Sequence, residues 1–160
     1  MDFGVFFEYP DGEAAARGAR PLFLADCTEH DWTLIREHAQ TRRFAAGALV
    51  VGAGDSDRAL YLVVDGTLEV VVPRQSTRHP AGALLGPGTV LGELGFLDGR
   101  PAEAAVRAVT DAQVLRLSLV EFEALAAKDP ALGRYLLFDL ARLLAERVMD
   151  LRGLLRQQGL

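Results

Sequence analysis

The pattern of apolar and polar positions changes character twice along the chain. Residues 28–40 predict a helix, because Thr28 has N-cap character and apolar residues follow at helical spacing: Trp32, Ile35 and Ala39. Residues 41–117 instead carry short apolar runs separated by closely spaced glycine, proline and aspartate turn signals. That pattern is typical of an antiparallel β-sandwich or β-roll.

The clearest strand pair is expected around Asp65-Gly66. Apolar runs lie on both sides of this dipeptide, at 59–64 and at 67–72. An Asp-Gly pair favours the tight turn whose twist matches two paired strands. The sequence therefore predicts a β-hairpin over residues 59–72.

Two further helices are predicted after the roll. Ser118 and Glu121 form a capping box before an apolar helical run, and Pro130 has the character of a first helical residue. The second helix is long and extends over about 130–157. With the first helix and the roll, this gives an α+β fold.

The long helix carries apolar residues at alternating spacings of four and three: Leu137, Ala141, Leu144, Val148, Leu151 and Leu155. Such a heptad seam is typical of paired helices. We expect a parallel homodimer contact through its second half, formed by Leu144, Val148, Leu151 and Leu155. The alternative is that the stripe packs on the β-roll, as we expect of its first two turns.

The candidate chemistry lies in the segment 88–109, GTVLGELGFLDGRPAEAAVRAV. Glycines around a short helical turn let backbone N–H groups approach an anion closely. The carboxylate of Glu93 cannot hold a phosphate, but it can accept hydrogen bonds from a sugar hydroxyl. The glycines of this segment thus have the character of an anion-binding loop.

This segment resembles the phosphate-binding cassette of cyclic-nucleotide-binding domains, which occur in catabolite activator proteins, protein kinase regulatory subunits and nucleotide-gated channels. The matching residues are Gly92 to Leu97, followed by Pro101, Ala104 and Val106. The run RALYLVVDGTLEVVV, together with Gly47 and Gly54-Asp55, is similar to the preceding strands of that family. The resemblance covers about residues 28–155.

The resemblance implies a β-roll of the jelly-roll or double-stranded β-helix type. An N-terminal helix, a short helix within the cassette and two C-terminal helices would complete it. It divides the chain into an extension at 1–21 and a domain at 22–160. The alternating aromatic residues of the extension, Phe3 to Tyr9, predict a terminal strand, packed locally in preference to a partner.

The sequence departs from the family pattern at one important position. Ala102 stands where the phosphate-binding arginine is expected, and Glu103 replaces the small residue after it. A buried phosphodiester needs a cation, and losing one partner of a buried charge pair costs about 3–5 kcal/mol. Arg100 is the candidate compensating cation, although its turn position favours solvent; Arg107 and Arg116 are weaker candidates.

The resemblance implies the following ligand-binding positions: Gly92, Glu93, Leu94, Gly95, Ala102, Glu103 and Ala104. It places Arg147 and Val148, on the long helix, beside a purine base, where hydroxyl residues would be expected. The only ligand implied is a cyclic nucleotide, cAMP or cGMP, and its binding is expected to be weakened or lost. Since no further helices follow Leu160, we expect no DNA-binding domain.

Composition and charge narrow the number of domains, the kinds of binding partner and the cellular location that we expect. The chain has 160 residues, enough for one domain, and a formal net charge of −5, which gives no general attraction for nucleic acid or a membrane surface. No apolar run reaches 18 residues and the N-terminus lacks a signal-peptide pattern, so we expect a cytoplasmic protein.

No motif supports catalysis or metal binding. Cys27 is the only cysteine, which excludes a disulfide within the chain and a zinc cluster, and we favour a buried thiol over a redox sensor. His30, His38 and His79 do not share a strand, so a cupin-like metal site is not predicted. We expect neither catalytic nor metal-binding residues, and hence no enzyme.

Three functional hypotheses follow. The first is a stand-alone regulatory or signalling domain in which ligand binding repositions the cassette and the long helix. The second is a ligand-free dimeric scaffold that binds a protein partner. The third is a sensor of a ligand without a phosphate, with Glu103 as a hydrogen-bond or cation partner.

Overall fold

The computed structural model describes residues 22–71 and 82–157, so the N-terminal extension and His79 lie outside the described part. Four helices and eight strands occur in these residues: α1 Glu29–His38, β1 Gln40–Phe44, β2 Leu49–Val51, β3 Ala59–Asp65, β4 Leu68–Val71, β5 Leu84–Leu85, β6 Val90–Leu91, α2 Glu93–Asp98, β7 Ala105–Ala108, β8 Ala112–Ser118, α3 Leu119–Lys128 and α4 Pro130–Gln157.

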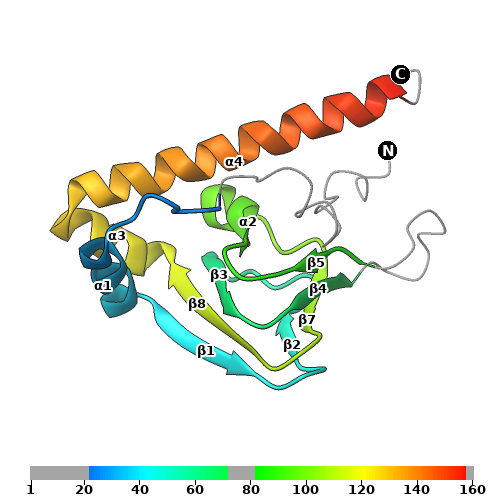
Figure 1. Cartoon of the computed structure of the whole chain (residues 1–160), viewed down its shortest axis with the longest axis horizontal. Coiled ribbons are helices and arrows are strands. Elements are labelled where there is room, and N and C mark those ends of the chain that lie inside the picture. The colour runs from blue at the N-terminus through cyan, green and yellow to red at the C-terminus, as the bar shows by residue number, and fades with distance from the viewer. Residues whose placement is uncertain (1–21, 72–81, 158–160) are drawn as a thin grey trace.

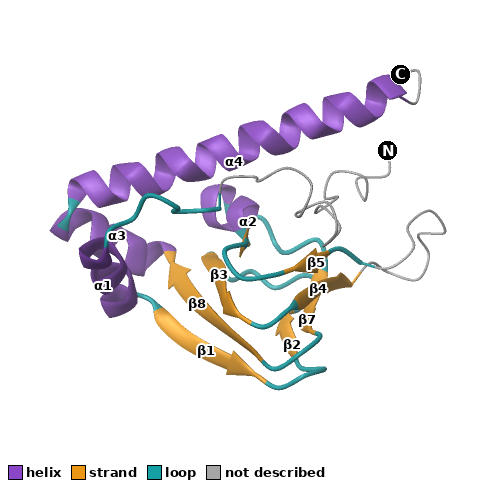
Figure 2. Cartoon of the chain, in the orientation of Figure 1, coloured by secondary structure: helices purple, strands orange, loops and turns teal. Residues whose placement is uncertain are grey.

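The strands form two four-stranded antiparallel sheets, in the orders β1-β8-β3-β6 and β2-β7-β4-β5. Helices α1 and α3 lie together at one end of the strands, and α4 runs along one side of them (Figure 1). Figure 2 shows α2 as the short helix between α4 and the strands. The predicted α+β roll, with its cassette helix and two C-terminal helices, is confirmed.

The predicted hairpin at 59–72 is wrong. Strand β3 pairs with β6 and β8, whereas β4 pairs with β5 and β7 in the other sheet. The Asp65-Gly66 turn therefore carries the chain from one sheet to the other. Gly66 has φ +82°, and a Cβ there would lie 2.3 Å from the carbonyl oxygen of Asp111, on the neighbouring connection between the sheets. Glycine is required by this crossing of two connections.

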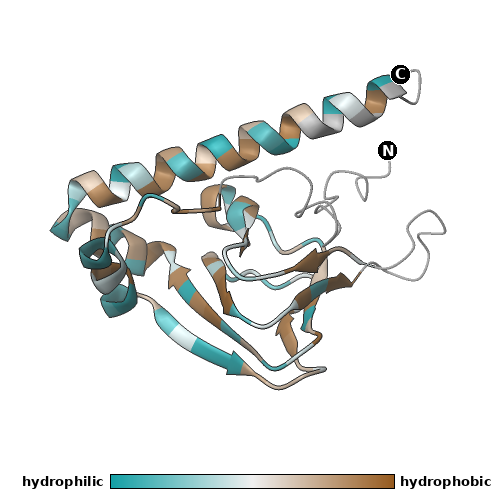
Figure 3. Cartoon of the chain, viewed as in Figure 1, coloured by the Kyte–Doolittle hydropathy of each residue, from teal (hydrophilic) through white to brown (hydrophobic). Residues whose placement is uncertain are grey.

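The reason for the crossing is that β3 is buried on both faces. Leu60 and Leu62 pack with the helices, while Tyr61 and Val63 pack in the interior of the roll. A strand with a single partner and one solvated face could not bury both rows. By contrast β1 is exposed over most of its length and is mainly hydrophilic (Figure 3). Two apolar cores result, one between the sheets and one between the helices and β3.

The predicted starts of α1 and α3 are confirmed. Each depends on hydrogen bonds between residues only three positions apart, which the sequence shows directly. The Thr28 hydroxyl accepts from the N–H of Asp31, whose carboxylate accepts from the N–H of Thr28. Ser118 and Glu121 form the same reciprocal pair before α3. The end of α1 was predicted too late, since Gln40 already belongs to β1 and pairs with Arg116.

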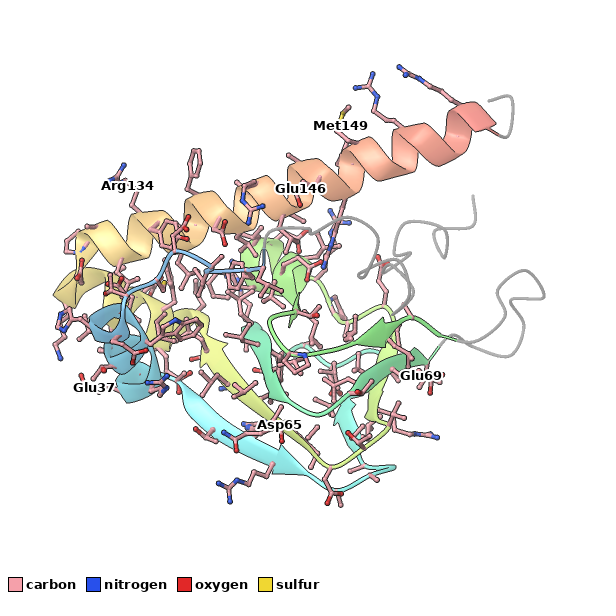
Figure 4. The ribbon with its side chains drawn as sticks, viewed as in Figure 1. Glu37, Asp65, Glu69, Arg134, Glu146 and Met149 are labelled. Carbon is pink, nitrogen blue, oxygen red and sulfur yellow. The ribbon has the colours of Figure 1, made fainter. Side chains whose placement is uncertain are left out.

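Helix α4 buries a different stripe from the one predicted to pack on the roll. Leu132, Leu136 and Leu140 are buried against the helical core, whereas Leu137 is 41% exposed and Ala141 is exposed. The first two turns of the heptad seam therefore face away from the roll. Figure 4 shows Arg134 and Met149 on the side of α4 that is turned away from the strands.

Cys27 lies just before α1, half-buried against the helical core. Burial, with the nearby carboxylates of Asp31 and Asp139, raises the pKa of this thiol to about 11. Little thiolate forms at neutral pH, which favours a packing role over a redox role. Within the described ranges, no helix has both the length and the apolar character needed to cross a membrane.

The orientation of α4 can be tested with two neighbouring leucines. Leu136→Ala should lower the free energy of unfolding by about 2–5 kcal/mol, because it removes a fully buried side chain. Leu137→Ala, with the same change in helix propensity, should lower it by roughly 0.5 kcal/mol or less. Urea denaturation at one protein concentration measures both. A larger loss for Leu137→Ala would contradict the described orientation.

Candidate functional site

The short helix α2 begins at a backbone position that only glycine occupies readily. Gly92, its N-cap, has φ +84°, and a Cβ there would lie 2.5 Å from the carbonyl oxygen of Ala59 on β3. The first turn of α2 can thus lie directly against the strand. Glu93 follows as the first helical residue, and its position is fixed by this close approach.

The other end of α2 is held from outside the cassette. The guanidinium of Arg58 donates to the carbonyl oxygens of Phe96, at 3.1 Å, and Leu97, at 2.9 Å. The ring of Phe96 is buried and meets the Phe122 ring edge to face, with centroids 5.5 Å apart. These contacts satisfy carbonyl groups that the last turn leaves open. The cassette helix is therefore anchored at both ends.

The chain after α2 is fixed by a separate loop. The N–H of Ala102 donates to the carbonyl oxygen of Asp55 at 2.8 Å, and its carbonyl accepts from the N–H of Gly54 at 2.7 Å. The Asp55 carboxylate in turn accepts from the N–H of Gly52 at 2.7 Å. The Gly54-Asp55 pair seen in the sequence thus sets the position of Ala102.

These elements surround a pocket that is open to solvent. All the cassette positions predicted from the sequence lie on its wall: Gly92, Glu93, Leu94, Gly95, Ala102, Glu103 and Ala104. The remaining lining residues are Val51, Val70, Leu91, Arg100, Pro101 and Val106. Most of the wall is apolar, so its charged groups decide which ligands it can accept.

Glu93 is buried, with only 2% of its surface exposed, and is paired with Arg147 from α4. One guanidinium nitrogen of Arg147 donates to Oε1 of Glu93, and the other lies 3.4 Å from the carbonyl oxygen of Val90. The resemblance placed Arg147 at the base side of a nucleotide. The structure instead joins Arg147 to the carboxylate of the cassette.

The candidate compensating cations lie in different surroundings. Arg100 borders the pocket, but its side chain is 66% exposed and its Nε lies 2.5 Å from the carboxylate of Asp98. Arg107 is exposed on β7. Arg116 is bound by Asp57. Of the residues on the pocket wall, all within the described part, only Arg100 has a cationic side chain.

Asp57, Arg116 and Tyr61 form a polar cluster where the loop enters β3. The guanidinium of Arg116 donates to both carboxylate oxygens of Asp57, and the Tyr61 hydroxyl donates to one of them. Hydrogen bonding from Arg116 lowers the pKa of Asp57 despite partial burial. Burial, followed by the contact with Asp57, raises the pKa of Tyr61 to about 12. At neutral pH Asp57 and Arg116 are therefore charged and Tyr61 is neutral.

Two residues of the predicted dimer seam, Val148 and Leu155, are exposed on α4. Val148 is 55% exposed, Leu155 is 37% exposed and Leu144 is half-buried, while the side chain of Leu151 is outside the described part. Val148, predicted beside a base, thus points to solvent in the single chain. In the described residues, no group of three or more histidine, cysteine or acidic side chains could hold a metal ion.

Sequence reasoning named Val106 as a cassette match but did not predict the apolar wall that it forms with residues of three other strands. Val51, Val70, Leu91 and Val106 come from β2, β4, β6 and β7, and they meet only after the roll has closed. Strand alternation could have assigned Val70 and Val106 to the inner face. It could not have brought β2, β4, β6 and β7 together around one pocket.

A β-roll that presents a glycine-rich cassette and a buried carboxylate to an open pocket defines a small-molecule-binding domain. The chain belongs to the cyclic nucleotide-binding domain family, whose model matches residues 41–129. The structure is similar to that of the Thermus thermophilus catabolite activator protein, with a TM-score of 0.68 and 31% identity, over 84% of this chain and 63% of that one.

Two curated relatives come from different classes of regulated protein. The cyclic AMP receptor protein of Thermus thermophilus is 32% identical over 82% of this chain and 60% of its own length. The cyclic nucleotide-gated potassium channel mll3241 of Mesorhizobium japonicum is 30% identical over 59% of this chain and 24% of its own. The chain spans less than two thirds of either relative. What it shares with both is the binding domain.

Proposed function

We propose that this chain is a regulatory ligand-binding domain in which affinity for the cyclic phosphate of cAMP or cGMP is weakened or lost. The observation that carries the proposal is Ala102 on the pocket wall, at the position of the family's phosphate-binding arginine. Its methyl group supplies neither charge nor hydrogen-bond donors. Glu103 beside it adds a negative charge at the same place.

The remaining charges of the pocket are already matched within the protein. Glu93 is paired with Arg147, and Arg100 is paired with Asp98. A phosphate that recruited either guanidinium would leave a carboxylate without its partner. For the buried Glu93 this would cost about 3–5 kcal/mol. Neither arginine is therefore an equivalent substitute for the missing one.

A regulatory role is supported by the relatives, whose names describe a receptor protein and a gated channel. The contact between Glu93 and Arg147 offers a route from ligand to helix, because it joins the cassette to α4. A ligand on Glu93 would change the balance between two positions of α4. This mechanism does not require a phosphate.

A dimeric scaffold is the second candidate, and the exposed apolar side chains of α4 favour it: Leu137, Phe138, Val148, Met149 and Leu155. They lie on the side of the helix away from the buried leucines. Toward its C-terminal end α4 also extends beyond the described strands (Figure 1). We propose that a second copy of the chain covers Leu144, Val148, Leu151 and Leu155, in parallel.

Isothermal titration with cAMP and cGMP tests the phosphate argument. The Ala102→Arg, Glu103→Ser double variant should bind one of them about 10²- to 10⁴-fold more tightly than the wild type, since it restores the cation and removes the repulsion. Arg100→Gln in the wild-type background is the control for compensation. Circular dichroism verifies that each variant is folded.

Two results would contradict this proposal. One is tight cyclic-nucleotide binding by the wild type, and its loss in Arg100→Gln would then identify Arg100 as the cation. The other is a folded double variant that binds no better than the wild type. In that case the residues at 102 and 103 are not what limits phosphate binding.

Light scattering coupled to size exclusion tests the dimer. The wild type should have twice the chain mass of 17.3 kDa, and Val148→Glu should be monomeric, because it places a charge in the paired seam. Ala131→Glu adds the same charge to an exposed position in the first turn and should stay dimeric. A monomeric wild type, or a dimeric Val148→Glu variant, would contradict the proposed dimer contact through α4.

A further inference from the structure

We propose that the N-terminal extension of this chain occupies the pocket when no ligand is bound, through the aromatic segment Phe3 to Tyr9. The contact is autoinhibitory, because a ligand enters the pocket only by displacing the segment. The inference rests on the proposed function, since it concerns access to the same ligand pocket. It is supported by the place where the extension joins the fold, by its length and by the chemistry of the pocket wall.

The extension joins the fold beside the strand that leads into the pocket. The described part of the chain begins at Leu22, whose side chain lies against Gly88; a Cβ on Gly88 would be 2.9 Å from it. Strand β6 begins two residues after Gly88, and Leu91 of β6 belongs to the pocket wall. Three residues of extended chain span only roughly 10 Å. The extension therefore leaves the fold close to the pocket.

This junction is fixed to the first half of α4. The N–H of Leu24 donates to the buried carboxylate of Asp139 at 2.6 Å, and Arg142 pairs with the same carboxylate. Phe23 and Leu24 are buried in the helical core. Leu24 has φ +59°, a conformation that leucine adopts only where its surroundings enforce it. Because the junction is anchored, the residues before it are confined to the neighbourhood of β6.

The length of the extension suits an intramolecular contact. The chain advances 13 residues from Tyr9 to Leu22, which span up to roughly 40 Å when fully extended. This is several times the span between Gly88 and Leu91. A short tether also gives an attached segment an effective concentration on the order of millimolar at a nearby site. A weak contact is therefore enough to keep the pocket occupied.

The pocket wall suits uncharged apolar side chains. Aliphatic side chains from four strands line it: Val51, Val70, Leu91 and Val106. An aromatic ring that covers them removes apolar surface from water on both partners. The two ion pairs at the pocket stay intact when an uncharged side chain enters. An occupant with apolar rings therefore has no charge pair to break.

The extension carries such side chains in a regular pattern. At the two-residue period of a strand, four apolar residues share one face: Phe3, Val5, Phe7 and Tyr9. The same period puts Phe6 on the opposite face. The apolar face is complementary to the pocket wall in chemistry, and Phe6 provides a control position within the same segment.

Variants of the full chain test the contact with a neutral apolar dye, N-phenyl-1-naphthylamine, whose fluorescence rises in apolar surroundings. The Phe3→Ser, Phe7→Ser double variant should bind the dye at least about 10-fold more tightly than the wild type, because its pocket is more often free. Phe6→Ser makes the same change on the opposite face and should bind the dye like the wild type.

Two further measurements locate the contact. Ala102→Trp, added to the double variant, fills the pocket and should lower dye affinity at least about 10-fold, with circular dichroism verifying the fold. In the wild type, nuclear Overhauser effects should join the aromatic protons of residues 3–9 to the methyl groups of Val70 and Val106. This last measurement needs no variant.

Any one of four results would overturn the proposal. Dye affinity could be equal in the wild type and the double variant, or unchanged by Ala102→Trp, which would mean that the extension covers another surface. The Overhauser effects could be absent, or could join only differently labelled chains, which would place the segment in a second copy. None of these results bears on phosphate binding. If Ala102→Arg, Glu103→Ser fails to bind cyclic nucleotides while the Overhauser effects are present, the proposed function is wrong and this contact stands.

Discussion

The contact between Glu93 and Arg147 constrains the rest of this structure. Glu93 is almost completely buried at the start of α2, and a carboxylate in that position is stable only with a charged partner. The partner comes from 54 residues further along the chain, on the second half of α4. The cassette, the pocket wall and the long helix therefore share one ion pair. We therefore expect a change in the surroundings of Glu93 to act on α4 as well.

The proposed function places weakened attraction for a phosphate at Ala102 and Glu103 on the pocket wall. The backbone around them is held by other parts of the chain: Gly54 and Asp55 bind Ala102, and Arg58 binds the end of α2. Under the proposed function, a ligand that contacts Glu93 biases the position of α4 through Arg147.

The local parts of the fold could be predicted from the sequence, because their signals lie within a few residues. Thr28 and Ser118 begin helices through contacts three residues away. The Asp65-Gly66 turn shows the limit of such signals, since the same dipeptide serves a hairpin and a crossing between sheets. What distinguishes the two cases is β3, which is apolar on both faces and therefore needs a partner on each side. The unbroken apolar run at 59–64 was the sequence signal for this.

The candidate site was predictable in part for the same reason. The cassette positions come from one continuous segment, whereas the apolar wall is assembled from four strands and the partner of Glu93 comes from a distant helix. The first two turns of the stripe on α4 were assigned to the wrong side because two apolar rows, one through Leu136 and one through Leu137, have nearly the same spacing. Only packing against the core distinguishes them.

The central claim, that one buried ion pair joins the cassette to α4, is tested most directly by a double-mutant cycle. Glu93→Gln, Arg147→Met and the combined variant are compared with the wild type by urea denaturation at one protein concentration. We predict a coupling free energy of about 2 kcal/mol or more, with the double variant more stable than the sum of the single changes implies. Additivity within about 0.5 kcal/mol would show that the two side chains do not depend on each other and would contradict the account.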